Sequence, residues 1–165
     1  MISVVKRPKN MTANRSALGK PEGGSWIEMA IEYTPIGFVE NKAEDVPRHW
    51  TVSDLEGILA IQPQYIEGLA DLAVGQRIVV LFHFHRSGAF SKAELKQPKR
   101  GSGKIRSVFS ICSPRRPNPI GMSVLEILAI DGGRIRVRGL DMFDGTPILD
   151  IKPFTRNAER PTDNT

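Results

Sequence analysis

Residues 120–140 read IGMSVLEILAIDGGRIRVRGL, and this stretch decides the fold. Apolar and β-branched residues dominate residues 120–130, which predicts a strand. Asp131-Gly132-Gly133 is typical of a tight hairpin turn, and residues 134–140 are expected to form the returning strand. The sequence therefore predicts an antiparallel β-hairpin over this stretch.

Further short strands are expected on both sides of this hairpin. The strongest is RIVVLFHFH, Arg77–His85, which is rich in β-branched and aromatic residues. One short helix is expected over Gln62–Leu72, where Pro63 stands near the start and apolar residues recur at helical spacing. The remaining expected strands are Ile27–Tyr33, Ile36–Val39, Leu55–Ile61, Ser107–Ile111 and Pro147–Ile151.

Many short strands joined by Gly and Asp turns, with little helix, are typical of a closed all-β architecture. We therefore predict a mainly β chain that forms a single small closed or nearly closed β-barrel with one or two short helices. A chain of 165 residues has room for one such domain with a proper core. We expect a flexible basic arm at residues 1–25, the barrel domain at 26–155 and a polar tail at 156–165.

The composition argues against secreted and membrane proteins. The single cysteine, Cys112, leaves no internal disulfide framework and fits a reducing compartment. No apolar run is long enough to cross a membrane, and no apolar stretch follows the N-terminal charges as a signal peptide requires. We therefore expect a cytoplasmic protein without a membrane partner.

Positive charge is concentrated in two stretches of the chain. Residues 86–116 hold nine Lys or Arg residues against Glu94 alone, and residues 1–20 hold five Lys or Arg residues and no acid. A protein polarised in this way presents a positive surface to a polyanion. A solvated face is the alternative for any charge run. Gly101-Ser102-Gly103 within the longer run indicates a mobile loop, which suits a ligand that must be wrapped.

The most specific stretch is SPRRPNPIGMS, residues 113–123. Pro117 and Pro119 flank Asn118, which fixes φ at both prolines and favours extended backbone before each of them. The result is a stiff platform that aims its side chains outward. Gly121 then allows a close backbone approach where the strand begins. A rigid turn with a purely structural role is the alternative.

Two other groups of residues are candidates for chemistry. In GLDMFDGTP, residues 139–147, Asp141 and Asp144 lie close enough to share one loop and to bind ribose hydroxyls, a substrate amine or a sulfonium charge. Asp144 is also a turn signal, because Gly follows it. His83 and His85 point to the same face of one strand. The nearest following acid lies across a loop, so we expect no metal site.

Three motifs taken together resemble one known family: FHFHRS at Phe82–Ser87, FSICSPRRPNPIGMSV at Phe109–Val124 and GLDMFDGTPILDIKPF at Gly139–Phe154. That family is the TrmO or YaeB-like (TsaA-like) family of β-barrel methyltransferases. PIGFVENK at Pro35–Lys42 and the Arg of VPRHW, Arg48, are similar to its opening segment. The ordered pair of RPNPIG and DGTP motifs carries most of the specificity.

The resemblance implies a barrel that binds S-adenosylmethionine near a homodimer interface and methylates N6 of threonylcarbamoyl-adenosine, just 3′ of the anticodon in tRNA. The positions that match the family's cofactor site are Arg48, His85, Arg116, Pro117, Asn118, Pro119, Met122, Asp141, Met142, Phe143 and Asp144. Three places depart from the family: Cys112 replaces an arginine, His49-Trp50 replaces Gln-Pro, and Gln76-Arg77 replaces Ser-His.

Methyl transfer from a sulfonium is an in-line displacement, so alignment of the nucleophile is the main task. Adenine N6 is a weak nucleophile because its lone pair is delocalised, and an acceptor for the N6 proton helps. We expect Asp141, or Asn118 with the carbonyls of the RPNP turn, in this role. The residues expected to bind substrate RNA are Arg86, Lys96, Lys99, Arg100, Lys104 and Arg115. The alternatives are a methyltransferase acting on a small molecule or non-tRNA substrate, and a non-catalytic RNA-binding β-barrel.

Overall fold

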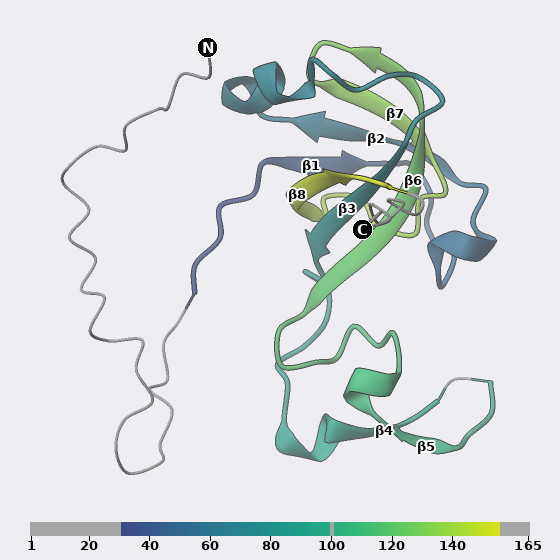
Figure 1. Cartoon of the computed structure of the whole chain (residues 1–165). Coiled ribbons are helices and arrows are strands. Elements are labelled where there is room, and N and C mark those ends of the chain that lie inside the picture. The colour runs from purple at the N-terminus through teal and green to yellow at the C-terminus, as the bar shows by residue number, and fades with distance from the viewer. Residues whose placement is uncertain (1–30, 100, 156–165) are drawn as a thin grey trace, which may run out of the picture. The chain divides into compact units, whose positions relative to one another are not determined.

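The computed structural model describes residues 31–99 and 101–155 of the chain, and Figure 1 shows their arrangement. Six strands form one antiparallel sheet in the order β1-β2-β7-β6-β3-β8. The sheet closes on itself because β1 also pairs with β8, and we call it the ring. The strands are β1 Gly37–Glu40, β2 Glu56–Ile61, β3 Arg77–His83, β6 Ile120–Asp131, β7 Arg134–Arg138 and β8 Pro147–Pro153.

Strand β6 is the longest strand of the ring, with 12 residues. It pairs with β3 in an unbroken register from Arg77 opposite Glu126 to His83 opposite Ile120. At its other end it turns into β7 through Gly132, whose φ of 54° suits glycine. The hairpin predicted over residues 120–140 is therefore confirmed.

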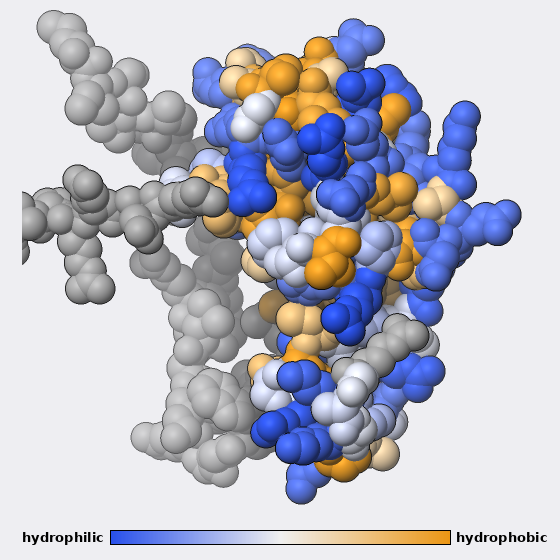
Figure 2. Space-filling view, turned by 90° about the vertical axis from the view of Figure 1, so that its right-hand side faces the viewer, coloured by the Kyte–Doolittle hydropathy of each residue, from blue (hydrophilic) through white to orange (hydrophobic). Residues whose placement is uncertain are grey.

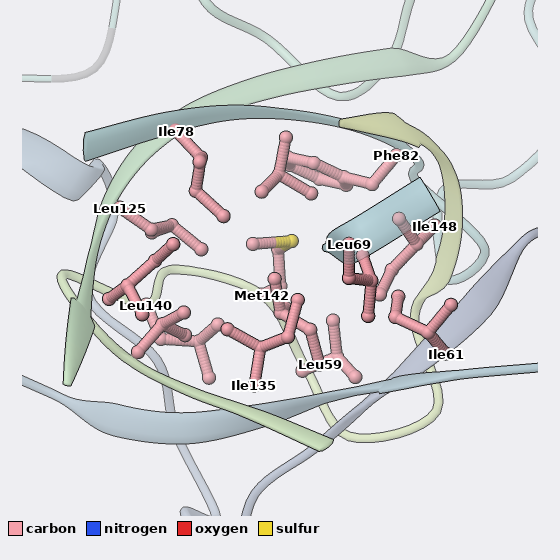
Figure 3. Close-up of a cluster of buried hydrophobic side chains, with 14 residues drawn as sticks. Leu59, Ile61, Leu69, Ile78, Phe82, Leu125, Ile135, Leu140, Met142 and Ile148 are labelled. Atoms are coloured by element: carbon pink, nitrogen blue, oxygen red, sulfur yellow. The ribbon is translucent and has the colours of Figure 1, made fainter. Parts of the chain in front are cut away.

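The core fills the inside of the ring. Alternate residues of the strands point inward, and Leu59, Ile78 and Leu125 from three different strands are completely buried. Met142 belongs to the connection between β7 and β8, and its side chain lies in the middle of this cluster (Figure 3). The connection that follows β7 is therefore anchored in the core.

Residues 86–116, which we call the basic segment, join β3 to β6 and extend away from the ring (Figure 1). Strands β4 Lys96–Pro98 and β5 Ile105–Ser107 form a separate two-stranded sheet there. Two short 3-10 helices flank it, η4 Lys92–Leu95 and η5 Val108–Ser110. Instead of the expected loop, this segment therefore carries regular structure.

Much of the predicted secondary structure is confirmed. The chain is mainly β with few helices, and the strands expected over Ile36–Val39, Leu55–Ile61 and Pro147–Ile151 correspond to β1, β2 and β8. The helix expected over Gln62–Leu72 is the 3-10 helix η3, Pro63–Leu69. With η2, Trp50–Val52, the described residues contain four short 3-10 helices, where one or two short helices were expected.

The strand predicted over Ser107–Ile111 is wrong, because η5 begins where β5 ends. The Ser110 hydroxyl donates to the Ser107 carbonyl at 2.8 Å, and such local bonds replace those of a strand partner. Residues 31–33 of the strand expected over Ile27–Tyr33 also form no strand. The rest of that strand, the arm at 1–25 and the tail at 156–165 lie outside the described residues.

The described part of the chain has no helix with the length and apolar character that crossing a membrane requires.

Gly121→Ala is expected to destabilise the ring. Gly121 lies opposite Phe82, and a Cβ at this position would lie 2.2 Å from Cζ of the Phe82 ring, which is itself buried. Because Phe82 must then move within a packed core, we expect the free energy of unfolding to fall by about 1–3 kcal/mol. Urea unfolding measures this loss.

Gly68→Ala is the matched control for this variant. A Cβ on Gly68 would meet no atom within 4 Å, so the free energy of unfolding should stay within about 0.5 kcal/mol of the starting protein. Equal urea midpoints for the two variants would show that Phe82 tolerates a side chain at position 121, the position it faces on β6.

Candidate functional site

A cavity of about 1800 Å³ lies between the ring and the basic segment. Its lining residues come from stretches that are far apart in the sequence: 45–52, 82–88, 97–103, 109–122 and 141–146. The RPNPIG stretch and the loop that follows β7 thus border the same space. These are the two stretches that sequence motifs single out as functional.

The RPNP turn is tied to its surroundings by backbone bonds. The Phe84 amide donates to the Pro119 carbonyl at 2.8 Å, and the Ile120 amide donates to the Asn118 carbonyl at 2.7 Å. The Gln97 side chain of the basic segment donates to the Arg115 carbonyl at 2.7 Å. The turn is therefore tied to β6 and to the residue after β3, and two of its carbonyls, those of Asn118 and Pro119, already accept a hydrogen bond.

Asp141 is a partly buried carboxylate in the cavity wall. Its Oδ1 accepts a hydrogen bond of 2.5 Å from the hydroxyl of Ser123, a fully buried residue of β6. Burial raises the pKa of Asp141, and the hydrogen bonds from Ser123 and from the Trp50 amide offset only part of this effect. Asp141 is therefore a stronger base than an exposed aspartate.

His85 has a hydrogen-bond partner at each of its two ring nitrogens. The Thr146 hydroxyl donates to the Phe143 carbonyl at 2.7 Å, so its oxygen accepts from Nδ1 of His85 at 3.3 Å. Nε2 is then the acceptor, and Nε of Arg86 lies 3.3 Å from it. Burial lowers the pKa of His85, and the charge of Arg86 lowers it further. These contacts favour the tautomer with the proton on Nδ1.

Of the residues expected to hold a cofactor, those that line the cavity are Arg48, His85, Arg116, Pro117, Asn118, Met122, Asp141, Met142 and Phe143. Pro119 and Asp144 are not part of the lining. The Asp144 carboxylate instead accepts a hydrogen bond of 3.0 Å from the Asn41 amide, so its place is in the turn. Met142 borders the cavity, but its side chain is 2 % exposed and packs in the core.

The residues expected to bind RNA are divided between two places. Arg86, Lys99 and Arg115 line the cavity, whereas Lys96 and Lys104 are exposed elsewhere on the basic segment. Arg100 lies outside the described residues.

Two of the lining arginines have partners of their own. The guanidinium carbon of Arg86 lies 4.5 Å from the centre of the Phe143 ring, and Arg115 forms a 3.2 Å ion pair with Glu94. Glu94 therefore offsets the charge of Arg115, whereas Arg86 keeps its positive charge over the aromatic ring.

Ser123, Thr146 and Phe109 are site residues that the sequence argument missed. Ser123 had a signal, because it is a polar residue within an apolar strand. Thr146 lies within the DGTP motif and Phe109 begins the motif FSICSPRRPNPIGMSV, but neither motif gave these residues a role of their own. Cys112 and His49, two positions at which the sequence departs from the expected family pattern, also line the cavity.

His49 and His85 have different hydrogen-bond partners. Nδ1 of His49 lies 2.8 Å from the Thr51 hydroxyl, and the His49 ring stacks on Trp50. His85 bonds Thr146 instead. Across residues 31–99 and 101–155, no three His, Cys, Asp or Glu side chains gather as a metal site would require.

Comparison with known proteins identifies the family to which the chain belongs. Residues 38–160 match the model of the tRNA-methyltransferase O N-terminal domain. A protein of Pyrococcus abyssi named "probable S-adenosyl-L-methionine-binding protein" is 38% identical over 132 residues, which cover 78% of this chain and 70% of that protein. The human tRNA (adenine(37)-N6)-methyltransferase is 43% identical over 82 residues, which cover 50% of this chain and 19% of the human protein.

A crystal structure of TrmO from Pseudomonas aeruginosa has a similar fold. The TM-score is 0.62 at 29% identity, and the match covers 83% of this chain. This chain spans only 62% of the length of that solved chain.

Asp141→Asn is expected to make the protein more stable near neutral pH. Because the pKa of Asp141 is raised by burial, the folded chain keeps this proton to a higher pH than the unfolded chain does. The free energy of unfolding therefore falls as the pH rises from the pKa of Asp141 in the unfolded chain to its higher pKa in the folded chain. An amide does not ionise, so this fall should disappear when urea unfolding is followed from about pH 4 to about pH 8.

The control is Asp54→Asn, which changes an exposed carboxylate. Its stability should follow that of the unaltered protein. If the free energy of unfolding of Asp141→Asn varies with pH as it does in the unaltered protein, ionisation of Asp141 does not destabilise the fold.

Proposed function

Because the chain belongs to the tRNA-methyltransferase O N-terminal domain family, we propose that it transfers a methyl group from S-adenosylmethionine to N6 of an adenosine in tRNA. The observation that carries the proposal is the shared cavity of the RPNPIG stretch and the 141–146 loop. The name of the human relative, tRNA (adenine(37)-N6)-methyltransferase, supports adenosine 37 as the target.

The cavity residues fit S-adenosylmethionine, which supplies an electrophilic methyl carbon on a sulfonium. Ile120 and Met122 are apolar yet 39% and 53% exposed, and Met122 lines the cavity beside Phe82. They offer apolar surface to an adenosyl group. Arg48 and Arg116 line the same cavity and would bind the carboxylate of the amino acid part. Asp141 would face the positive charge of the cofactor.

Asp141 is the proposed acceptor of the N6 proton. Its raised pKa makes the carboxylate a better base, and Ser123 holds one of its oxygens in place. An oriented acceptor directs the N6 lone pair away from the ring and toward the methyl carbon. Asn118 is a second candidate for the proton acceptor. Its backbone carbonyl already accepts a hydrogen bond from the Ile120 amide, so the side-chain carbonyl oxygen would take this role.

The finer features of the reaction are also proposals. The family resemblance supports threonylcarbamoyl-adenosine as the substrate, a homodimer as the active unit and the cytoplasm as its place. The cavity is open to solvent, so an RNA strand could reach it. Arg86 is proposed as a wall of the cofactor site as well as an RNA contact, because it packs on Phe143.

S-Adenosylmethionine is expected to bind in the micromolar range, which corresponds to about −8 kcal/mol. Replacing Arg116 with Ala should weaken binding about tenfold or more, because a charge-assisted hydrogen bond is lost. Isothermal titration calorimetry measures both affinities.

Arg136→Ala is the matched control, because Arg136 is exposed on β7 and pairs with Glu56. Cofactor affinity should not change in this variant. If no heat is detected at millimolar S-adenosylmethionine, the methyltransferase proposal fails and the non-catalytic RNA-binding alternative takes its place.

Asp141→Asn is expected to lower kcat for methyl transfer about 10²- to 10⁴-fold, with little change in cofactor affinity, because only the proton acceptor is lost. Ser123→Ala should act differently. Without the Ser123 hydrogen bond the pKa of Asp141 rises further, so the acidic limb of the pH–rate profile should move to higher pH. Ser123→Thr keeps the hydroxyl and should restore the profile. An unshifted profile in Ser123→Ala would exclude Asp141 as the base.

A further inference from the structure

Phe109 is a large apolar side chain on the cavity wall that is 75% exposed. Its neighbour Val108 is only 1% exposed, which anchors the helix η5 that carries both residues. The Ser110 hydroxyl bonds back to the Ser107 carbonyl at 2.8 Å and closes this turn. Phe109 is therefore presented to solvent from an anchored backbone, although phenylalanine is usually buried.

The surroundings of Phe109 are polar and positive. Lys99, Arg115 and Arg116 line the same cavity, and only Arg115 has an ion-pair partner among the described residues. Figure 2 shows apolar surface interleaved with strongly hydrophilic side chains on the lower part of the molecule, which holds β4 and β5. An aromatic face beside cations suits a ligand that has both a flat ring and a phosphate.

From this arrangement we propose that Phe109 is a stacking site for one unstacked nucleobase of the RNA substrate. The inference rests on the proposed function and adds to it a residue that recognises the base. A base that an enzyme modifies must leave the helical stack, and aromatic side chains commonly receive unstacked bases. Lys99, which lines the same cavity, would then contact an adjoining phosphate.

A second copy of the chain is a poorer occupant for this surface. In a two-fold interface both copies contribute the same patch, so Phe109 would bring the basic segment of one copy close to that of the other. Like charges brought together in this way oppose association. An RNA strand carries the complementary charge instead.

The test measures binding of a short RNA stem-loop with an adenosine in its loop. Phe109→Ala should weaken binding about 5- to 100-fold, as the loss of one stacked base predicts. Phe109→Trp should bind at least as tightly as the unaltered protein, whereas Phe109→Leu, which is apolar but has no π-face, should resemble Phe109→Ala. The loss should be the same factor at low and high salt, because stacking releases no counterions.

Ile105→Ala is the matched control. Ile105 is 61% exposed on β5 of the same segment but does not line the cavity, so this variant should bind RNA normally. An equal loss in Ile105→Ala, full binding by Phe109→Leu, or no RNA binding by the unaltered protein would overturn the inference. Conversion of a dimer to a monomer by Phe109→Ala, measured by sedimentation, would assign the surface to a second copy.

The RNA affinities are measured without cofactor, so they decide the inference independently of the proposed reaction. Failure of the unaltered protein to bind S-adenosylmethionine or to transfer a methyl group would remove the proposed function. The dependence of RNA affinity on Phe109 would still show whether the stacking site exists.

Discussion

The pairing of β1 with β8 is the constraint on which the rest of the structure depends. It closes the ring through only two residue pairs, Gly37 with Ile148 and Phe38 with Pro147. The same strand continues into contacts with the loop that lines the cavity. The Val39 amide donates to the Thr146 carbonyl at 2.9 Å, and the Gly145 amide donates to the Val39 carbonyl at 2.8 Å. Strand β1 therefore both closes the sheet and holds the 141–146 loop in position.

The site combines groups with opposite energetic effects. The Thr146 hydroxyl donates to the Phe143 carbonyl and accepts from His85, and these two hydrogen bonds satisfy polar groups and support the fold. The buried carboxylate of Asp141 costs stability when it is ionised. A protein tolerates such a group where a strong base is useful, and Ser123 limits the cost with a hydrogen bond.

Sequence patterns were sufficient for the ring and insufficient for the basic segment. The long strand β6 has its own turn and its own apolar pattern, so local chemistry decides its structure. In the basic segment, Val108 is buried by contacts that no local pattern predicts, and η5 replaces the expected strand. For the site, motifs located Asp141 and the RPNP turn. The turn signal at Asp144 agrees with the hydrogen bond that its carboxylate accepts from the Asn41 amide. The motifs could not show that Met142 points inward, because this depends on how the strands pack around it.

The position of Met142 has a consequence for protein engineering. Its side chain lies in the middle of the core (Figure 3), while the residues on either side of it, Asp141 and Phe143, face the cavity. A larger or smaller residue at any core position that touches Met142 will shift the backbone of its neighbours, since packed interiors transmit strain. Thermostabilising designs that repack this core will therefore also change the shape of the cavity wall, and sequence libraries should vary core and cavity residues together.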